Sequence, residues 1–187
     1  MKLGYVLMNI GLELAKKEMT PNMYWAFRSL ISDARFLSQE KLSYKVIDTS
    51  ELVDIARKQL GDIKFYASDS EVYYCSLDAW RKIIKADLVD RIFYQEEKFD
   101  CDNFALVFSS FMSLLYGLNS AGIATGIMRD AKTKEIIGGH AYNILVADVD
   151  GEVKLFVYEP QNDDLVEASN SAQVGGTLYE TKLVWWR

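Results

Sequence analysis

The dipeptide Asp150-Gly151 constrains the fold of this chain most strongly, because it lies between two segments that alternate like β-strands. Asp-Gly is a preferred pair for a two-residue hairpin turn, whose twist suits the strands on either side. The segments HAYNILVADV and EVKLFVYE are therefore predicted to pair antiparallel. Similar alternation of β-branched and aromatic residues in GIATGIMRD and LYETKLVWW predicts further strands, so the second half is expected to form a sheet.

The hairpin turn also fixes which residues lie opposite each other. With Val149 opposite Glu152, His140 lies roughly opposite Gln161, and Glu159 lies two positions away on the diagonal. Diagonal neighbours on one face of a sheet are within reach of long side chains. The register therefore predicts that His140 and Glu159 come close together.

The first half of the chain has mainly helical periodicity. Apolar residues recur at helical spacing in residues 5–18, 22–38 and 50–60, and Gly61 ends the last of these. Two short extended segments follow, and Ser76 is then positioned to cap another helix. Helices are therefore expected to precede the sheet.

Length and composition favour one domain. The chain has 187 residues, of which 50% are hydrophobic, and only two prolines, so it can bury one sizeable core and has no obvious linker. We expect a single domain over residues 1–187, with a mostly helical lobe at 1–94 and a Cys-bearing helix plus an antiparallel sheet at 95–187. This organisation is an α+β fold.

Composition also restricts the partners and the compartment. The net charge of -6 and the absence of a basic stripe oppose binding to nucleic acid. The longest apolar stretch, FALVFSSFMSLLYG, is shorter than the roughly 20 residues that a bilayer requires, so no membrane partner is expected. Two cysteines, Cys75 and Cys101, are too few for a disulfide framework, which favours free thiols in a reducing cytoplasm. The sequence gives no indication of the oligomeric state.

Cys101 lies at the predicted start of a helix. Asp100 is suited to cap that helix, Asp102 falls in its first turn, and Gly117 supplies a stop. The dipole of a helix start lowers the pKa of a thiol, whereas neighbouring carboxylates raise it. Cys101 is therefore interpreted either as a buried structural thiol or as a nucleophile whose thiolate depends on a protonated histidine.

His140 is the only histidine, so any cysteine–histidine chemistry in this chain has to use it. A nucleophilic thiol needs a base, and the base needs a polar group that orients its ring. Glu159 is the carboxylate best placed to hold that ring. The candidate catalytic residues are therefore Cys101 as nucleophile, His140 as base and then acid, and Glu159 as the orienting group.

The stretches CDNFALVFSSFMSLLYGLNSAGIATGIMRD and GGHAYNILVADVDGEVKLFVYEPQ resemble the core of the transglutaminase-like cysteine peptidase superfamily. In that family a Cys opens a helix with Ala four residues on, His-Ala plus an aromatic residue opens a strand, and an acid before Pro ends another. The matching residues are Cys101 and Ala105, His140 with Ala141 and Tyr142, and Glu159 with Pro160. The likeness covers residues 95–163 and is nearest to the bacterial transglutaminase-like cysteine proteinases.

The resemblance implies a papain-like architecture and an enzyme, a cysteine hydrolase or acyltransferase that acts on an amide bond through a thioester. It implies a peptide or protein substrate and no cofactor. Gln95, six residues before Cys101, is a candidate oxyanion donor by likeness to papain-like enzymes. The chain departs from the family at Glu159, where Asp is usual, and at Asp102, where many members have Trp. No metal is expected, because no pair of ligands has the spacing of a known zinc or calcium motif.

Two other functions remain open. A chain that keeps this fold without catalysis would be a binding protein, an alternative favoured by the acids beside Cys101 and by Glu159. A structural or assembly protein would instead use exposed aromatic side chains as an interface. The aromatic residues of the strands and of the fourth helix are expected mainly in packing roles; they include Tyr73, Tyr74, Trp80, Trp185 and Trp186.

Overall fold

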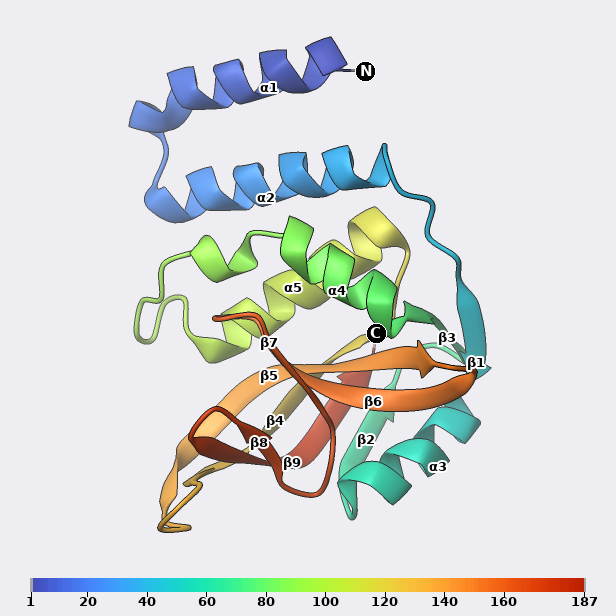
Figure 1. Ribbon diagram of the computed structural model, residues 1–187. Helices are drawn as coiled ribbons and strands as arrows, with labels where there is room; N and C mark the ends of the chain where they lie inside the picture. The colour runs from blue at the N-terminus through green and yellow to red at the C-terminus, as the bar shows by residue number, and fades with distance from the viewer. Residues whose placement is uncertain (1, 187) are drawn as a thin grey trace.

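The computed structural model describes the fold of residues 2–186 and the side chains of residues 4–186. Helices and a large sheet form successive layers (Figure 1). The helices are α1 (Lys2–Ala15), α2 (Pro21–Leu37), α3 (Thr49–Leu60), α4 (Leu77–Ala86) and α5 (Cys101–Tyr116), with short 3-10 helices η1 (Lys16–Glu18) and η2 (Val89–Arg91). The strands are β1 (Lys45–Asp48), β2 (Lys64–Ala67), β3 (Glu71–Ser76), β4 (Ala121–Asp130), β5 (Ile136–Val149), β6 (Glu152–Glu159), β7 (Asp164–Glu167), β8 (Ala172–Val174) and β9 (Thr177–Trp186). None of the helices in the described part of the chain is long and apolar enough to cross a membrane.

The helices predicted for the first half are confirmed, and local capping explains where they begin. The Thr20 hydroxyl accepts a hydrogen bond from the Met23 N–H at the start of α2, and the Ser76 hydroxyl accepts one from the Ala79 N–H at the start of α4. The α4 helix is shorter than the stretch SLDAWRKIIKADLVDRIF, which was expected to be helical throughout. It ends at Ala86, and the carboxylate of the next residue, Asp87, accepts the Val89 N–H and opens the separate turn η2.

The sheet is mixed, whereas an antiparallel sheet was predicted. Nine strands join in the order β1-β3-β5-β4-β9-β2, with β6 and then β7 attached beside β5, and β8 beside β9. Two of the pairings, β3 with β5 and β2 with β9, are parallel. Three of the strands come from the first half of the chain, so the expected papain-like division into a helical half and an antiparallel half is wrong. Parallel neighbours need long connections, and the segment from α4 to β4 supplies one between β3 and β5.

The predicted hairpin between β5 and β6 is confirmed. Asp150 and Gly151 have φ angles of 53° and 92°, and Val149 pairs with Glu152. The ladder between these strands ends at Asn143. The chain then leaves β6 in a tight turn after Glu159, while β5 continues as a partner of β4 alone.

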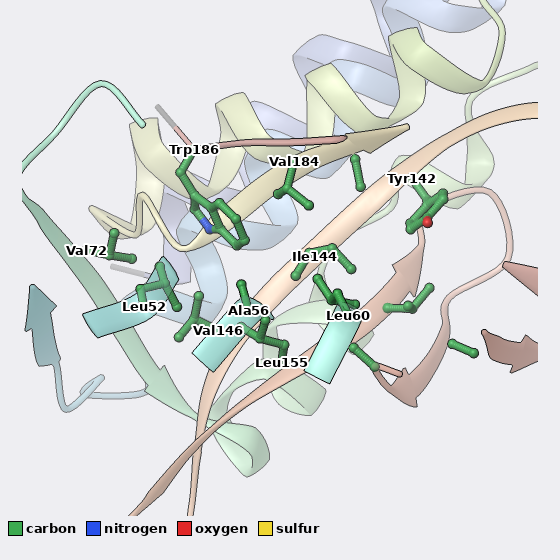
Figure 2. Packing of buried hydrophobic residues seen from close by; sticks show 14 of the residues in the cluster. Leu52, Ala56, Leu60, Val72, Tyr142, Ile144, Val146, Leu155, Val184 and Trp186 are labelled. Atoms are coloured by element: carbon green, nitrogen blue, oxygen red, sulfur yellow. The ribbon is translucent and has the colours of Figure 1, made fainter. Parts of the chain in front are cut away.

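Both faces of the sheet are buried, which explains why β5 has a nearly continuous apolar sequence. On one face, α3 packs on Ile144 and Val146, and Trp186 of β9 joins this cluster (Figure 2). On the other face, α4 and α5 cover Leu145 and Ala147. The helix that begins at Cys101 therefore lies against the centre of the sheet, with α2 and then α1 outside it (Figure 1).

Candidate functional site

The sequence around Cys101 builds a helix start that is anchored at the sheet. Asp100 and Asn103 form a capping box, and the Asp100 N–H donates to Asn103 Oδ1 at 3.1 Å. One turn further on, the Ala105 carbonyl accepts a hydrogen bond of 3.0 Å from the buried Asn143 side chain of β5. These bonds fix the first turn of α5 relative to the strand that carries His140.

Cys101 and His140 line the same cavity, which has a volume of about 320 Å³. The Cys101 side chain is partly exposed, so the thiol is not sealed in the core. Burial raises the pKa of the Cys101 thiol, and the N–H groups of Ala141 and Asp102, which bond the sulfur, lower it. The Asp100 and Asp102 carboxylates also raise this pKa. A thiolate at neutral pH therefore depends on a positive charge at the imidazole.

The predicted contact between His140 and Glu159 is present. His140 Nε2 lies 2.5 Å from Glu159 Oε2, and the two side chains are only 9% and 4% exposed. With Nε2 held by the carboxylate, Nδ1 is the ring nitrogen left for a partner in the cavity. The structure therefore brings an imidazole with a fixed orientation to the cavity that contains the thiol.

The Glu159 carboxylate also accepts hydrogen bonds from Tyr179 and Gln161, which the sequence did not indicate as site residues. Tyr179 donates its hydroxyl to Glu159 Oε2 at 2.9 Å, and its ring meets the His140 ring edge-on at 5.3 Å. Burial raises the pKa of Tyr179, which keeps this hydroxyl protonated. Gln161 donates its backbone N–H to Glu159 Oε1 at 3.2 Å and its side-chain amide at 3.3 Å. The position of Gln161, two residues after Glu159, is typical of such a turn and could have indicated this contact. Nothing in the sequence of β9 indicates that Tyr179 reaches Glu159.

Gly126 allows two strands to meet at the edge of this cavity. A Cβ atom at Gly126 would lie 2.2 Å from the Glu180 carbonyl oxygen, and the ladder between β4 and β9 shifts register between Thr125 and Gly126. Such a bulge next to a site redirects nearby side chains. Lys182, the residue that this shift leaves unpaired, and Thr125 both line the cavity.

The structure does not bring Gln95 to the cavity. Gln95 is exposed and exchanges two backbone hydrogen bonds of 2.8 Å with Phe99, which closes a small turn before α5. Cys75 is equally remote, because it is fully buried among the aromatic residues under α4 and burial raises its pKa to about 12. Among residues 4–186, no group of three His, Cys, Asp or Glu side chains is placed to hold a metal ion.

The fold and the site together define an α+β domain with a mixed sheet and a thiol–imidazole–carboxylate cavity. The family model of the ricin-type beta-trefoil lectin C-terminal domain matches residues 43–175, and the chain belongs to this family. The assignment to transglutaminase-like cysteine peptidases is therefore wrong, and so are the papain-like fold and the peptidase activity inferred from it. Because the family is a lectin family and not a peptidase family, the expectation of a peptide or protein substrate is also wrong.

Two solved structures have a similar fold. One is described as the PSL1a-E64 complex, with 23% sequence identity and a TM-score of 0.51, covering 75% of this chain and 51% of that one. The other is Polyporus squamosus lectin bound to the human-type influenza-binding epitope Neu5Aca2-6Galb1-4GlcNAc, with 22% identity and a TM-score of 0.53, covering 75% of this chain and 49% of that one. The chain thus spans about half the length of each of these two structures. A search of curated proteins finds no match to this chain.

Proposed function

We propose that this chain functions in carbohydrate recognition of the lectin type. The observation that carries the proposal is the family match over residues 43–175. It is supported by the similarity in fold to a lectin that was solved with a sialylated glycan. The proposed ligand class is therefore an oligosaccharide rather than a polypeptide.

The best candidate for a sugar-binding surface is an open cavity of about 440 Å³ beside β3. Tyr44 and Tyr73 line it and are 50% and 44% exposed, so two aromatic faces are available to the C–H groups of a sugar ring. The Glu71 carboxylate accepts the Tyr73 hydroxyl at 3.2 Å and has further lone pairs for sugar hydroxyls. Aromatic faces with a few polar groups at the edge are what small-ligand sites use for affinity and orientation.

Titration of the protein with the trisaccharide Neu5Aca2-6Galb1-4GlcNAc and with neutral Galb1-4GlcNAc tests this proposal by calorimetry. We expect binding of at least one glycan, and a loss of binding in Tyr73→Ala. Tyr66→Ala is the matched control, because Tyr66 is 57% exposed on β2 and does not line the cavity. Equal loss in both variants would contradict the assigned surface, and absence of binding across a glycan array would contradict carbohydrate recognition itself.

We also propose a role for the cavity around Cys101, because a specific geometry favours it. Cys101 is proposed as the nucleophile, His140 as its base, and Glu159 as the residue that positions the imidazole. The single observation behind this proposal is the 2.5 Å contact between His140 and Glu159 at the wall of the cavity that Cys101 lines. The thiol would transfer its proton to His140, and the sulfur would add to an electrophilic carbon of a bound molecule. The electron pair displaced from that carbon would then take the proton back from His140.

Alkylation with iodoacetamide between pH 5 and pH 9 measures this reactivity, and Cys75 serves as the buried internal control. We expect Cys101 to react faster than a free thiol below pH 7, and His140→Ala to slow the reaction by roughly 100-fold. Glu159→Gln removes the charge that holds the imidazolium and should slow it less. An unchanged rate in His140→Ala would remove His140 from the proposed role.

The compartment and the domain organisation are part of the proposal. We place the chain in the reducing cytoplasm, where Cys75 and Cys101 stay free thiols. We also propose that residues 1–187 unfold as one cooperative unit. Coincident urea transitions by tryptophan fluorescence and far-UV circular dichroism are expected, and two separate transitions would contradict a single unit.

A further inference from the structure

Lys182 adds a positive charge to the cavity that contains Cys101. Its side chain lines this cavity from β9, the strand that pairs with β4 in the sheet (Figure 1). Among the described residues that line the cavity, it is the one lysine or arginine, and the proposed roles of Cys101, His140 and Glu159 make no use of it. The thiol chemistry alone therefore does not account for a lysine at this wall.

A β-bulge turns Lys182 toward the cavity. Tyr179 and Val184 of β9 both belong to the hydrophobic cluster that α3 covers, although they are five positions apart in the sequence. Residues an odd number of positions apart lie on opposite faces of a regular strand. The ladder with β4 skips Lys182 between Thr181 and Leu183, and this extra residue returns Val184 to the cluster. The irregularity thus leaves Lys182 outside the ladder, on the cavity side of the sheet.

The charge of Lys182 is only partly compensated by its neighbours. Lys182 Nζ lies 3.6 Å from Glu180 Oε2, but Arg129 Nε already donates to Glu180 Oε1 at 2.7 Å. The hydrogen bond from Arg129 is the main reason why the pKa of Glu180 lies below its usual value, so this carboxylate is ionised at neutral pH. Two cations therefore share one carboxylate. A net positive charge remains at the cavity wall, and the Lys182 side chain is 55% exposed, so its ammonium is accessible to a ligand.

A second wall of the cavity, on α5, is acidic. Asp100 and Asp102 line it from the start of this helix, on either side of Cys101 in the sequence. A ligand with one anionic group is therefore attracted to the Lys182 side and repelled from the α5 side. Such opposed charges contribute more to the choice and orientation of a ligand than to its affinity. With the anionic group at β9, the rest of the ligand extends across the cavity toward Cys101.

We propose that Lys182 determines the specificity of this site by selecting an electrophilic ligand that carries a carboxylate group. The proposal rests on the role proposed for Cys101 and adds the chemical class of the ligand. A single ammonium balances the one negative charge of a carboxylate. A phosphate group carries nearly two negative charges at neutral pH, so part of its charge would remain facing Asp100 and Asp102. A cationic ligand would be repelled from the β9 wall by the ammonium of Lys182.

Lys154 provides a matched comparison for Lys182. It also lies on a strand, β6, and its Nζ is 3.5 Å from a carboxylate oxygen of Glu167. It does not line the cavity of Cys101. Replacing either lysine by glutamine makes the net charge of the protein more negative by the same amount, so a difference between the two variants reports on the position of Lys182.

The rates of alkylation of Cys101 by iodoacetate and by iodoacetamide test the proposal, because the two reagents differ in carrying a carboxylate or a neutral amide. We expect Lys182→Gln to lower the ratio of the iodoacetate rate to the iodoacetamide rate by roughly fivefold, the size of one exposed ion pair. Lys182→Arg keeps the charge and should keep the ratio, and Lys154→Gln should leave it unchanged. High salt should reduce the effect of Lys182→Gln, since it screens the attraction.

Binding of succinate, an unreactive dicarboxylate, gives a measurement that does not require the thiol to react. His140 is the only histidine, so one imidazole proton signal in the NMR spectrum reports a ligand in the cavity. We expect succinate, but not neutral succinamide, to shift this signal. The dissociation constant for succinate should be higher by roughly fivefold in Lys182→Gln.

The succinate measurement distinguishes the failure of this proposal from the failure of the role proposed for Cys101. An unreactive Cys101 in a protein that binds succinate through Lys182 would contradict the role of the thiol and support the ligand class. Equal succinate affinity in the wild type and in Lys182→Gln, or an equal loss in Lys154→Gln, would overturn the proposal for Lys182 at any rate of alkylation.

Discussion

Replacing Asp33 by Asn should remove one defined part of the pH dependence of stability in this protein, beside the parts contributed by the carboxyl groups of Asp87 and Asp163. Asp33 of α2 is fully buried, where Oδ1 accepts the Tyr116 hydroxyl at 2.6 Å and Oδ2 accepts the Ser29 hydroxyl at 3.4 Å. Burial raises the pKa of Asp33 from 3.8 to about 6, while these two hydrogen bonds lower it. The nearby carboxyl group of Asp87, whose pKa burial also raises, is a like charge and so disfavours the ionised form of Asp33 further.

The sign and the size of the effect follow from this raised pKa. A carboxyl group whose pKa is higher in the folded state stabilises the fold fully below pH 3.8, and that stability is lost as the pH rises through about 6. A rise of the pKa from 3.8 to about 6 corresponds to a loss of about 3 kcal/mol at high pH, of which about 2 kcal/mol falls between pH 4 and pH 8.

Urea unfolding at pH 4, 6 and 8 measures this difference. Asn keeps the acceptor for Tyr116 and does not titrate, so the free energy of unfolding of Asp33→Asn should change less with pH than that of the wild type. The difference between the two proteins should grow by about 2 kcal/mol in favour of Asn from pH 4 to pH 8. Parallel curves for the two proteins would refute the reasoning, because they would mean that Asp33 titrates normally in the folded state.

Three further predictions concern the site and the core. Gly126→Ala should destabilise the protein by more than about 1 kcal/mol in thermal denaturation, because the new methyl group meets a backbone carbonyl. The control Gly138→Ala should cost less than about 1 kcal/mol, because no atom lies near a Cβ at that position. Tyr179→Phe removes one hydrogen bond to Glu159 and should slow alkylation of Cys101 by roughly tenfold without altering that of a free thiol. Phe108→Ala should cost about 3–5 kcal/mol in urea unfolding, since Phe108 is fully buried between α5 and the sheet.

Local signals predicted the helices and the hairpin, and they failed for the sheet as a whole. Thr20, Ser76 and the pair Asp150-Gly151 act on their immediate neighbours, so their effect is visible in the sequence. The strand β1 went unpredicted, because only Ile47 of its four residues is buried and alternation is too short to detect. Which strands pair in parallel depends on long connections, and periodicity carries no information about them.

The sequence predicted the part of the site that depends on the pairing register of β5 and β6. The turn at Asp150-Gly151 fixed the pairing of two strands, and the contact between His140 and Glu159 followed from it. Tyr179 reaches Glu159 from a strand on the far side of β4, so no spacing along the chain could indicate it. The family was assigned wrongly because a Cys at a helix start with His and an acid on nearby strands describes a local arrangement that different folds can carry.

The central proposal is that the Cys101 thiol and the His140–Glu159 pair act as one reactive unit. Incubation with E64 at pH 6.5 followed by intact-mass measurement tests it most directly, with wild type, Cys101→Ser, Cys75→Ser and His140→Ala compared. The account predicts one covalent adduct in the wild type and in Cys75→Ser, none in Cys101→Ser, and a strongly slowed reaction in His140→Ala. An adduct that persists in Cys101→Ser, or a rate that does not depend on His140, would contradict it.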